Sequence, residues 1–523
     1  MSLRLLRPEL ARNMYAREID AVLPRVFALV DRDPLSPTRG CGDRQYWAWK
    51  LIDFPNGTLQ GAVNGLSALL SADAFAPHVP RGQIEDLVTE MQAASLRMMR
   101  RDGSFEEALP YEQSYCVTAL VVYDHLCAAM RLGMPLTAVR PLERAIGFLE
   151  RRDETHGFIS NHLATAAAAL YRWHRLTGEN AARAKADLLL NRILSHQSQE
   201  GWFVEYGGAD PGYQTLCMTH LADAAETTGN EQLWTALDKG VSFLSHFVHP
   251  DGSFGGIYGS RATRIYYPAA MEFLAPRSPL AASIAARMKR AIGEAATVPL
   301  SAIDQPNLMP VFNNYCQALL VAGDRDDSSE WQVPTGRRAM PEAGLLIDIG
   351  ARHHTIVSTR KGGVTYHWRE GKLALCDAGI ALRDDSRVLT SQADDPAHAV
   401  EITNDVVFVS GALHHLAIPL PNAVNFLVLR LLSTTVMRLP PLNALIKQLI
   451  ARMLVKGRKV NRGTFTRKIT LGPELRIEDT WQPGELQRIA DGASFSATHM
   501  ASAGYWQMGD LTRENYEPSG GGT

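Results

Sequence analysis

The chain has 523 residues, of which 46% are hydrophobic and 21% charged, as in ordinary globular proteins. Its length predicts two or three domains rather than one. The formal net charge of −2 excludes an overall basic field, so we expect no nucleic-acid partner.

Four turns of similar sequence recur in the first part of the chain. They read RRDGSF, DETHGF, QSQEGWF and HPDGSF, and their final phenylalanines lie 53, 45 and 51 residues apart. The runs between them, such as HLATAAAALYRWHRLTG, place apolar residues at helical spacing and end at glycine. A period of about fifty residues is typical of stacked helix hairpins. We therefore predict helix hairpins over residues 1–325, in an open solenoid or a closed ring.

The pattern changes after about residue 340. The stretch GLLIDIGARHHTIVSTRKGGVTYHW alternates apolar and polar residues and is rich in β-branched side chains, and TFTRKITLGPELRIEDTW has the same character. The polar stretch 323–342 is a plausible domain boundary. We predict a mainly antiparallel β domain over residues 340–523.

Polar side chains follow the repeated turns, where a ring of hairpins would present them at one mouth. Histidine is a general base near neutral pH, and tyrosine can donate or accept a proton when it is placed close. Asparagine and arginine can neutralise a carboxylate. A structural role in packing or in the turns is the alternative for each of them. The candidates are Asn161, His162, Tyr206, Tyr213, Arg261, Asn313 and Asn314.

Part of this set resembles a known group of enzymes. Asn161-His162 and Tyr213, which lies 51 residues past His162 in GGADPGY, are similar to the Asn-His pair and the tyrosine loop of heparinase II/III-like and alginate-lyase-like polysaccharide lyases. The resemblance implies an N-terminal (α/α) toroid followed by an antiparallel β-sandwich domain. It also implies that Asn161, His162 and Tyr213 are catalytic, together with His353 or His354 of the β domain. Arg261 resembles the substrate-binding arginine, and the further substrate-binding candidates are Tyr206, Tyr258, Asn314 and Glu112.

The implied chemistry is removal of the C5 proton of a uronic acid residue. The carbanion formed next to a carboxylate needs a neutralised carboxylate and a matched base. Asn161 and Arg261 would hold the carboxylate, and His162 and Tyr213 would exchange protons with C5. Expulsion of the C4 substituent would make the enzyme a lyase, and return of a proton to the opposite face would make it a C5-epimerase. We expect no cofactor and no catalytic metal, because His353-His354 and His414-His415 lack the i,i+4 spacing of a helical zinc site.

A basic insertion interrupts the predicted β domain. Residues 406–473 contain no Asp or Glu but ten Lys and Arg residues. Within 423–460, two apolar stretches have helical periodicity, and the second places Lys447 and Arg452 opposite Leu442, Leu445 and Leu449. Such helices fit an anionic membrane surface. Packing against the β domain or a partner with the basic face in solvent is one alternative, and binding of an anionic glycan is another.

The sequence also suggests where the enzyme works. The N-terminal stretch does not resemble a signal peptide, no clean transmembrane span is evident, and the six cysteines lack CxxC spacing. We expect a cytoplasmic enzyme, peripheral on the inner face of the membrane, that acts on a lipid-linked glycan during cell-surface polysaccharide biosynthesis. Cleavage would destroy a growing chain, so epimerisation is favoured over elimination.

Two other functions remain open. A glycoside hydrolase on an (α/α) toroid would need paired carboxylates, for which the candidates are Asp102, Glu112, Asp210 and Asp251. Asp102 and Asp251 lie inside the DGSF turns, where aspartate ordinarily binds the turn backbone. A glycan-binding protein without catalysis is the other alternative, and the aromatic stretch 42–61 could either stack on sugars or pack in the first hairpin.

Overall fold

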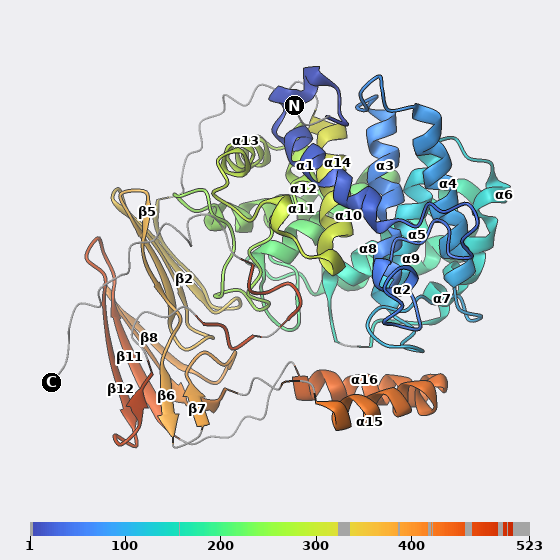
Figure 1. The fold of residues 1–523 in the computed structure, drawn as a ribbon. Coiled ribbons are helices and arrows are strands. Elements are labelled where there is room, and N and C mark those ends of the chain that lie inside the picture. The colour runs from blue at the N-terminus through green and yellow to red at the C-terminus, as the bar shows by residue number, and fades with distance from the viewer. Residues whose placement is uncertain are drawn as a thin grey trace.

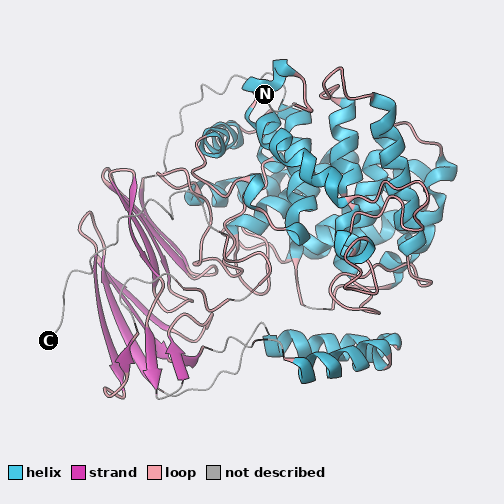
Figure 2. Ribbon diagram, viewed as in Figure 1, coloured by secondary structure: helices cyan, strands magenta, loops and turns pink. Residues whose placement is uncertain are grey.

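The computed structural model describes residues 4–155, 157–322, 335–384, 387–416, 420, 422–454, 463–489, 495–498 and 500–505. Helices make up the first part of the chain and strands most of the second part (Figure 2). The predicted fold class, a helical toroid followed by an antiparallel β domain with a helical insertion, is confirmed.

The toroid is built from paired helices that pack on their neighbours in sequence order. Its last long helix packs against α3 and α1 near the start of the chain, and Asn313 fastens this closure by accepting from Gly65 N–H and donating to Gly61 O, both at 2.9 Å. The hairpins therefore form a closed ring. The helices are α1 (Met14–Leu29), α2 (Arg44–Trp47), α3 (Ala62–Ser71), α4 (Arg81–Met98), α5 (Tyr115–Arg131), α6 (Leu136–Val139), α7 (Glu143–Arg151), α8 (Ser160–Thr177), α9 (Asn180–Ser195), α10 (Pro211–Thr228), α11 (Glu231–Leu244), α12 (Ala269–Leu274), α13 (Pro279–Gly293) and α14 (Gln305–Ala322).

The repeated DGSF turns are corners of this ring. Asp102 Oδ1 accepts hydrogen bonds from the backbone N–H (3.0 Å) and the hydroxyl (2.7 Å) of Ser104. Asp251 binds Ser253 in the same way, at 3.0 and 2.6 Å. Gly103 has a φ of +94°, a conformation that favours glycine. The interpretation of these aspartates as turn residues is confirmed.

The described residues of the β domain form three antiparallel sheets. Their strand orders are β1-β2-β3-β4-β5, β10-β7-β6-β13 and β12-β11-β9-β8, and the last two sheets flank a second hydrophobic core that includes Val407, Phe465 and Ile469. The strands are β1 (Gly336–Met340), β2 (Leu345–Ile349), β3 (His353–Ser358), β4 (Val364–Arg369), β5 (Lys372–Asp377), β6 (Ala381–Asp384), β7 (Arg387–Thr390), β8 (Ala399–Thr403), β9 (Val406–Ala412), β10 (His414–His415), β11 (Thr464–Thr470), β12 (Arg476–Gln482) and β13 (Gln487–Arg488).

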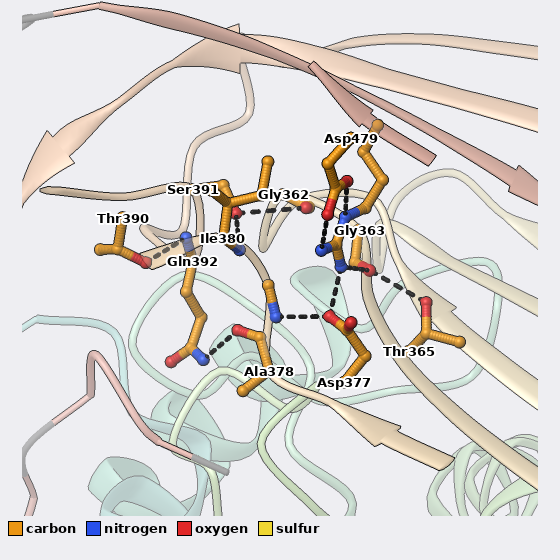
Figure 3. Close-up of polar contacts among 12 residues, drawn as sticks. Gly362, Gly363, Thr365, Asp377, Ala378, Ile380, Thr390, Ser391, Gln392 and Asp479 are labelled. Atoms are coloured by element: carbon orange, nitrogen blue, oxygen red, sulfur yellow. Dashed lines mark hydrogen bonds and ion pairs between the residues drawn. The ribbon is translucent and has the colours of Figure 1, made fainter. Parts of the chain in front are cut away.

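A buried arginine links these sheets. Arg467 of β11 is fully buried, and its guanidinium forms a two-pronged ion pair with Asp479 of β12 at 2.7 and 2.8 Å. It also binds Asp377, at the end of β5, and the carbonyl of Gly363. Figure 3 shows Asp377 and Asp479 converging on this point from different strands. Because both carboxylates and the guanidinium are paired, their charges are tolerated inside the domain.

The insertion forms two helices, α15 (Ala423–Thr434) and α16 (Pro440–Leu454), which lie together along one side of the toroid, away from the sheets (Figure 1). Residues 455–462, which include the end of the predicted 423–460 segment, and residues 506–523 are outside the described part of the chain. None of the described helices is both long enough and apolar enough to cross a bilayer.

Candidate active site

The starts of α8 and α10 carry the predicted Asn-His pair and the predicted tyrosine. The two helices pack against each other, and a short loop between α9 and α10 joins their first turns through bridges from Glu205 to Ile159 and Gly208. Asp210 caps α10 by accepting from Tyr213 N–H at 3.0 Å, and Pro211 occupies the first helical turn, where it needs no N–H partner. Helix starts favour nearby negative charge, as a bound carboxylate would supply.

Asn161 is held by a buried carboxylate that the sequence did not identify. Its Nδ2 donates to Glu205 Oε2 at 2.8 Å, and its backbone N–H donates to Glu205 Oε1 at 3.0 Å. Glu205 is fully buried. Burial raises the pKa of Glu205 to about 7, although Arg261 and the two donors of Asn161 oppose the shift. Glu205 therefore fixes the orientation of the Asn161 amide and titrates near neutral pH.

Arg261 connects this carboxylate to the tyrosine. Its guanidinium carbon lies 3.5 Å from the centroid of the Tyr213 ring and 4.8 Å from that of Tyr206, and Nη1 lies 3.7 Å from Glu205 Oε2. Arg261 is 8% exposed, and within the described residues its Nε and Nη1 make no hydrogen bond. A buried cation with donors to spare is suited to a carboxylate ligand.

Tyr213 is nearly buried in this cluster. It is 9% exposed, and burial raises the pKa of its hydroxyl above the ordinary value, with Arg261 acting in the opposite direction. The phenol therefore keeps its proton in the resting protein at neutral pH. Such a group is better suited to giving a proton than to taking one.

His162 has a carboxylate partner of its own. Its Nδ1 lies 2.6 Å from Glu154 Oε2, and the two side chains are 12% and 2% exposed. A carboxylate on one ring nitrogen fixes the tautomer and orientation of the imidazole. His162 and Glu154 thus form a His–carboxylate pair at the start of α8.

The β domain holds the loop that carries Arg261. Lys361, in the turn between β3 and β4, is 2% exposed and donates from Nζ to the carbonyls of Ile257 (2.9 Å) and Gly259. Asp210 binds the same loop through Arg261 N–H at 3.0 Å. Burial lowers the pKa of Lys361 to about 8. The position of Arg261 therefore depends on both domains.

The two candidate histidines of the β domain point in different directions along β3. His353 Nε2 lies 2.9 Å from Asp348 Oδ2 on the neighbouring strand. His354 is 2% exposed and packs among aromatic rings, with Trp368 at 5.3 Å and His249 at 6.2 Å between centroids. Burial lowers the pKa of His354 to about 3, so its imidazole is neutral. A catalytic role for either histidine stays a prediction.

Several other predicted residues are engaged within the fold. The Tyr258 hydroxyl lies 2.8 Å from His249 Nε2 in the same aromatic cluster. Asn314 accepts from Ala269 N–H at 2.8 Å and donates to Thr219 at 3.0 Å, which uses both ends of its amide between helices. Tyr206, by contrast, lies against Arg261.

The carboxylates considered for hydrolysis are bound to backbone. Glu112 Oε2 accepts from three successive backbone N–H groups, those of Glu107, Ala108 and Leu109, and so organises a loop. Asp210 accepts from three as well, including those at the start of α10 and at Arg261. Neither arrangement resembles an acid and a base facing each other across a glycosidic bond. Among the described residues, no group of three or more His, Cys, Asp or Glu side chains is placed to hold a metal.

The comparisons with known proteins identify the fold. No family model matches the chain, and no curated protein matches its sequence. Among solved structures, a Paenibacillus xanthan lyase superposes with a TM-score of 0.52 at 10% identity, over 88% of this chain and 45% of the lyase. The chain has a polysaccharide-lyase fold. It spans less than half the length of that xanthan lyase.

Two further lyase structures are among the similar ones. A Streptomyces coelicolor chondroitin AC lyase, solved with chondroitin sulphate, has a TM-score of 0.48 at 13% identity, covering 78% of this chain and 67% of its own. Heparinase III has a TM-score of 0.44 at 10% identity, with 64% and 58% covered.

Sequence reasoning brought Asn161, Tyr213 and Arg261 together but missed Glu205 and Glu154. Both glutamates adjoin the repeated turns, Glu154 inside DETHGF and Glu205 two residues after Phe203. A glutamate next to a repeated turn could have pointed to these two residues. The pattern does not single them out, because Glu106 and Glu107 lie in a similar position after Phe105.

Proposed function

We propose that the chain removes the C5 proton of a uronic acid residue in a glycan and acts as a uronyl C5-epimerase. The observation that carries the proposal is the contact of buried Arg261 with the Tyr213 ring, together with the Glu205 carboxylate that lies next to both Arg261 and the amide of Asn161. A substrate carboxylate bound by Arg261 would place C5 next to the tyrosine. The similarity of the fold to that of a xanthan lyase supports a polysaccharide substrate.

In this reaction His162 accepts the proton from C5. The electron pair of the broken C–H bond moves into the carboxylate, where the charge of Arg261 stabilises the resulting enediolate. Tyr213 then gives its phenolic proton to the opposite face of C5, which inverts the centre. A proton passes from His162 back to Tyr213 through solvent, and the resting state is restored.

We favour epimerisation as the first candidate because elimination would cut a glycan that is being built, whereas inversion leaves its chain intact. His162 and Tyr213 stand on separate helices, α8 and α10, and each has its own partner, Glu154 and Arg261. Inversion requires an acid and a base on opposite faces of the reacting carbon. A pair of groups held by separate partners is compatible with that requirement.

A polysaccharide lyase is the second candidate, favoured by the similarity of the fold to that of a xanthan lyase. Its first step would be the same. Tyr213 would then protonate the O4 oxygen as the C4–O4 bond breaks, which leaves an unsaturated sugar and a shortened chain.

Incubation with uronate-containing glycans in deuterated water distinguishes these reactions. Deuterium at C5 of an intact, partly inverted chain is the result expected of the epimerase. An ultraviolet-absorbing unsaturated end would identify the lyase. New reducing ends without unsaturation or deuterium would identify a hydrolase and would contradict proton abstraction.

A further inference from the structure

The helix pair α15–α16 presents an apolar surface to solvent. On α15, Val424 is 69% exposed, Phe426 60% and Leu427 69%, although side chains of these types are ordinarily buried. Adjacent positions on a helix point in different directions, so the start of α15 is exposed on more than one side. The full set of strongly exposed apolar side chains here is Leu420, Val424, Phe426, Leu427, Val428, Leu431, Leu439, Leu442, Leu445 and Leu449.

Three cations whose side chains the structure describes, Arg430, Arg438 and Lys447, are at least partly engaged in protein contacts. Arg430 pairs with Asp53, and the Arg438 guanidinium donates to the Tyr111 hydroxyl at 3.0 Å and lies over its ring at 4.5 Å. Lys447 is 7% exposed. This arrangement differs from a helix pair whose basic side chains all lie in solvent, although Arg438 remains exposed.

Polar contacts fix the apolar face outward. Asn443 of α16 is 2% exposed and donates to the carbonyls of Tyr111 (2.8 Å) and Glu112 (3.2 Å) in the toroid loop that Glu112 organises. Met437, between the helices, is fully buried. The pair is thus bound to the toroid through polar contacts, which leaves its strongly exposed leucines between 39% (Leu442) and 69% (Leu427) exposed.

The toroid also exposes apolar side chains close to α15. The loop that Arg430 contacts, at Asp53 and Phe54, also carries Trp49 (63% exposed) and Leu51 (72% exposed). Tryptophan is enriched at membrane–water interfaces, where its ring meets both apolar and polar surroundings.

We propose that α15 and α16, with the loop at Trp49, dock the protein on a lipid bilayer by inserting their exposed apolar side chains. Helices of this length lie in the interface and bury their apolar side at the boundary of headgroups and acyl chains. A glycan is a poor occupant because the face offers aliphatic groups and few donors or acceptors. The absence of acids over residues 406–473 is compatible with anionic headgroups. The proposal is independent of the reaction proposed for Tyr213.

Flotation of the full chain with lipid vesicles tests the proposal. The protein should float with phosphatidylcholine vesicles, and more so when phosphatidylglycerol is included. Leu427→Ser combined with Leu431→Ser removes two side chains one helical turn apart, 69% and 62% exposed, and should weaken binding at least about tenfold. Trp49→Ser should weaken it further.

Leu188→Ser is the matched control, because Leu188 is 50% exposed on α9 of the toroid, away from the helix pair. It should leave binding unchanged, and all variants should keep the thermal unfolding temperature of the parent. Three results would overturn the proposal: no vesicle binding by the parent chain, undiminished binding by the double variant, or a lipid-free dimer that the double variant converts to monomer. The last result would assign the face to a second copy.

Discussion

At the scale of single residues, the site is a chain of charges linked by named contacts. Glu154 holds His162, Glu205 holds Asn161, and Arg261 lies between Glu205 and the Tyr213 ring. The residue types and their spacing were enough to predict Asn161, Tyr213 and Arg261. Glu205 could not be predicted, because its partner Asn161 lies 44 residues away and only the packing of α8 on α10 brings the two together.

Glu154 should act as a positioning residue for His162. Glu154→Gln keeps the size of the side chain but removes the charge, so we expect kcat to fall about 10- to 100-fold with little change in KM. Steady-state kinetics with a uronate-containing glycan that the parent protein converts would measure both kcat and KM. A rise in KM at unchanged kcat would mean that Glu154 serves substrate binding instead.

Glu205 should make folding depend on pH. Its pKa is raised by burial to about 7 in the folded protein, so the folded state holds a proton that the unfolded state has lost above pH 4.5. Stability should therefore fall as pH rises from about 4.5 to 7, by up to roughly 1.4 kcal/mol per pH unit from this group. Glu205→Gln cannot lose a proton and lacks this contribution.

Urea unfolding of the parent and of Glu205→Gln across this pH range gives the measurement. As the pH increases, the unfolding free energy of Glu205→Gln should rise relative to that of the parent. A difference that stays constant between pH 4.5 and 7 would show that Glu205 is not titrating there.

At the scale of elements, the helices and turns could be predicted from the sequence. Which face of a helix is covered by the rest of the protein could be predicted less well. The DGSF turns were predicted as corners and are corners, because the Asp–Ser hydrogen bonds that form them are local. The amphipathic pattern of α16 showed two faces. Since Asn443 and Lys447 pack inward while Leu445 and Leu449 face out, the covered side is decided by loop 107–112 of the toroid, which is remote in sequence.

The turn between β3 and β4 should control substrate binding through Lys361. Lys361→Met removes the donors that hold the carbonyls of Ile257 and Gly259, so the loop bearing Arg261 should loosen. We expect KM to rise about tenfold, with a smaller effect on kcat, and Lys361→Arg should recover part of the loss. An unchanged KM for Lys361→Met would show that the toroid positions this loop by itself.

At the scale of the whole molecule, the toroid carries the candidate reacting groups, and the β domain holds the loop of Arg261 and carries the helix pair. The sequence predicted this division from the change of pattern after about residue 340. It did not predict the Arg467 ion pairs, because the partners Asp377 and Asp479 belong to different strands that only the folded sheets bring together.

Removal of Arg467 should unfold the β domain selectively. Arg467→Met removes the cation from half-buried Asp377 and leaves buried Asp479 with Arg488 alone, which should cost about 3 kcal/mol of stability. Urea denaturation followed by circular dichroism should show earlier loss of the strand signal with the helical signal little changed. A shift below about 0.5 kcal/mol would mean that solvent and Arg488 stabilise these carboxylates well enough without Arg467.

The central claim is that Tyr213 and His162 exchange protons with C5 of a uronic acid residue. The most direct measurement is nuclear magnetic resonance of uronate glycans in deuterated water, with parent protein, Tyr213→Phe, and Leu188→Ser as a surface control. We predict that the parent and the control form C5-inverted residues that carry deuterium and that Tyr213→Phe forms them at least about 100-fold more slowly. Formation of inverted, deuterated residues by Tyr213→Phe at the parental rate would contradict the account.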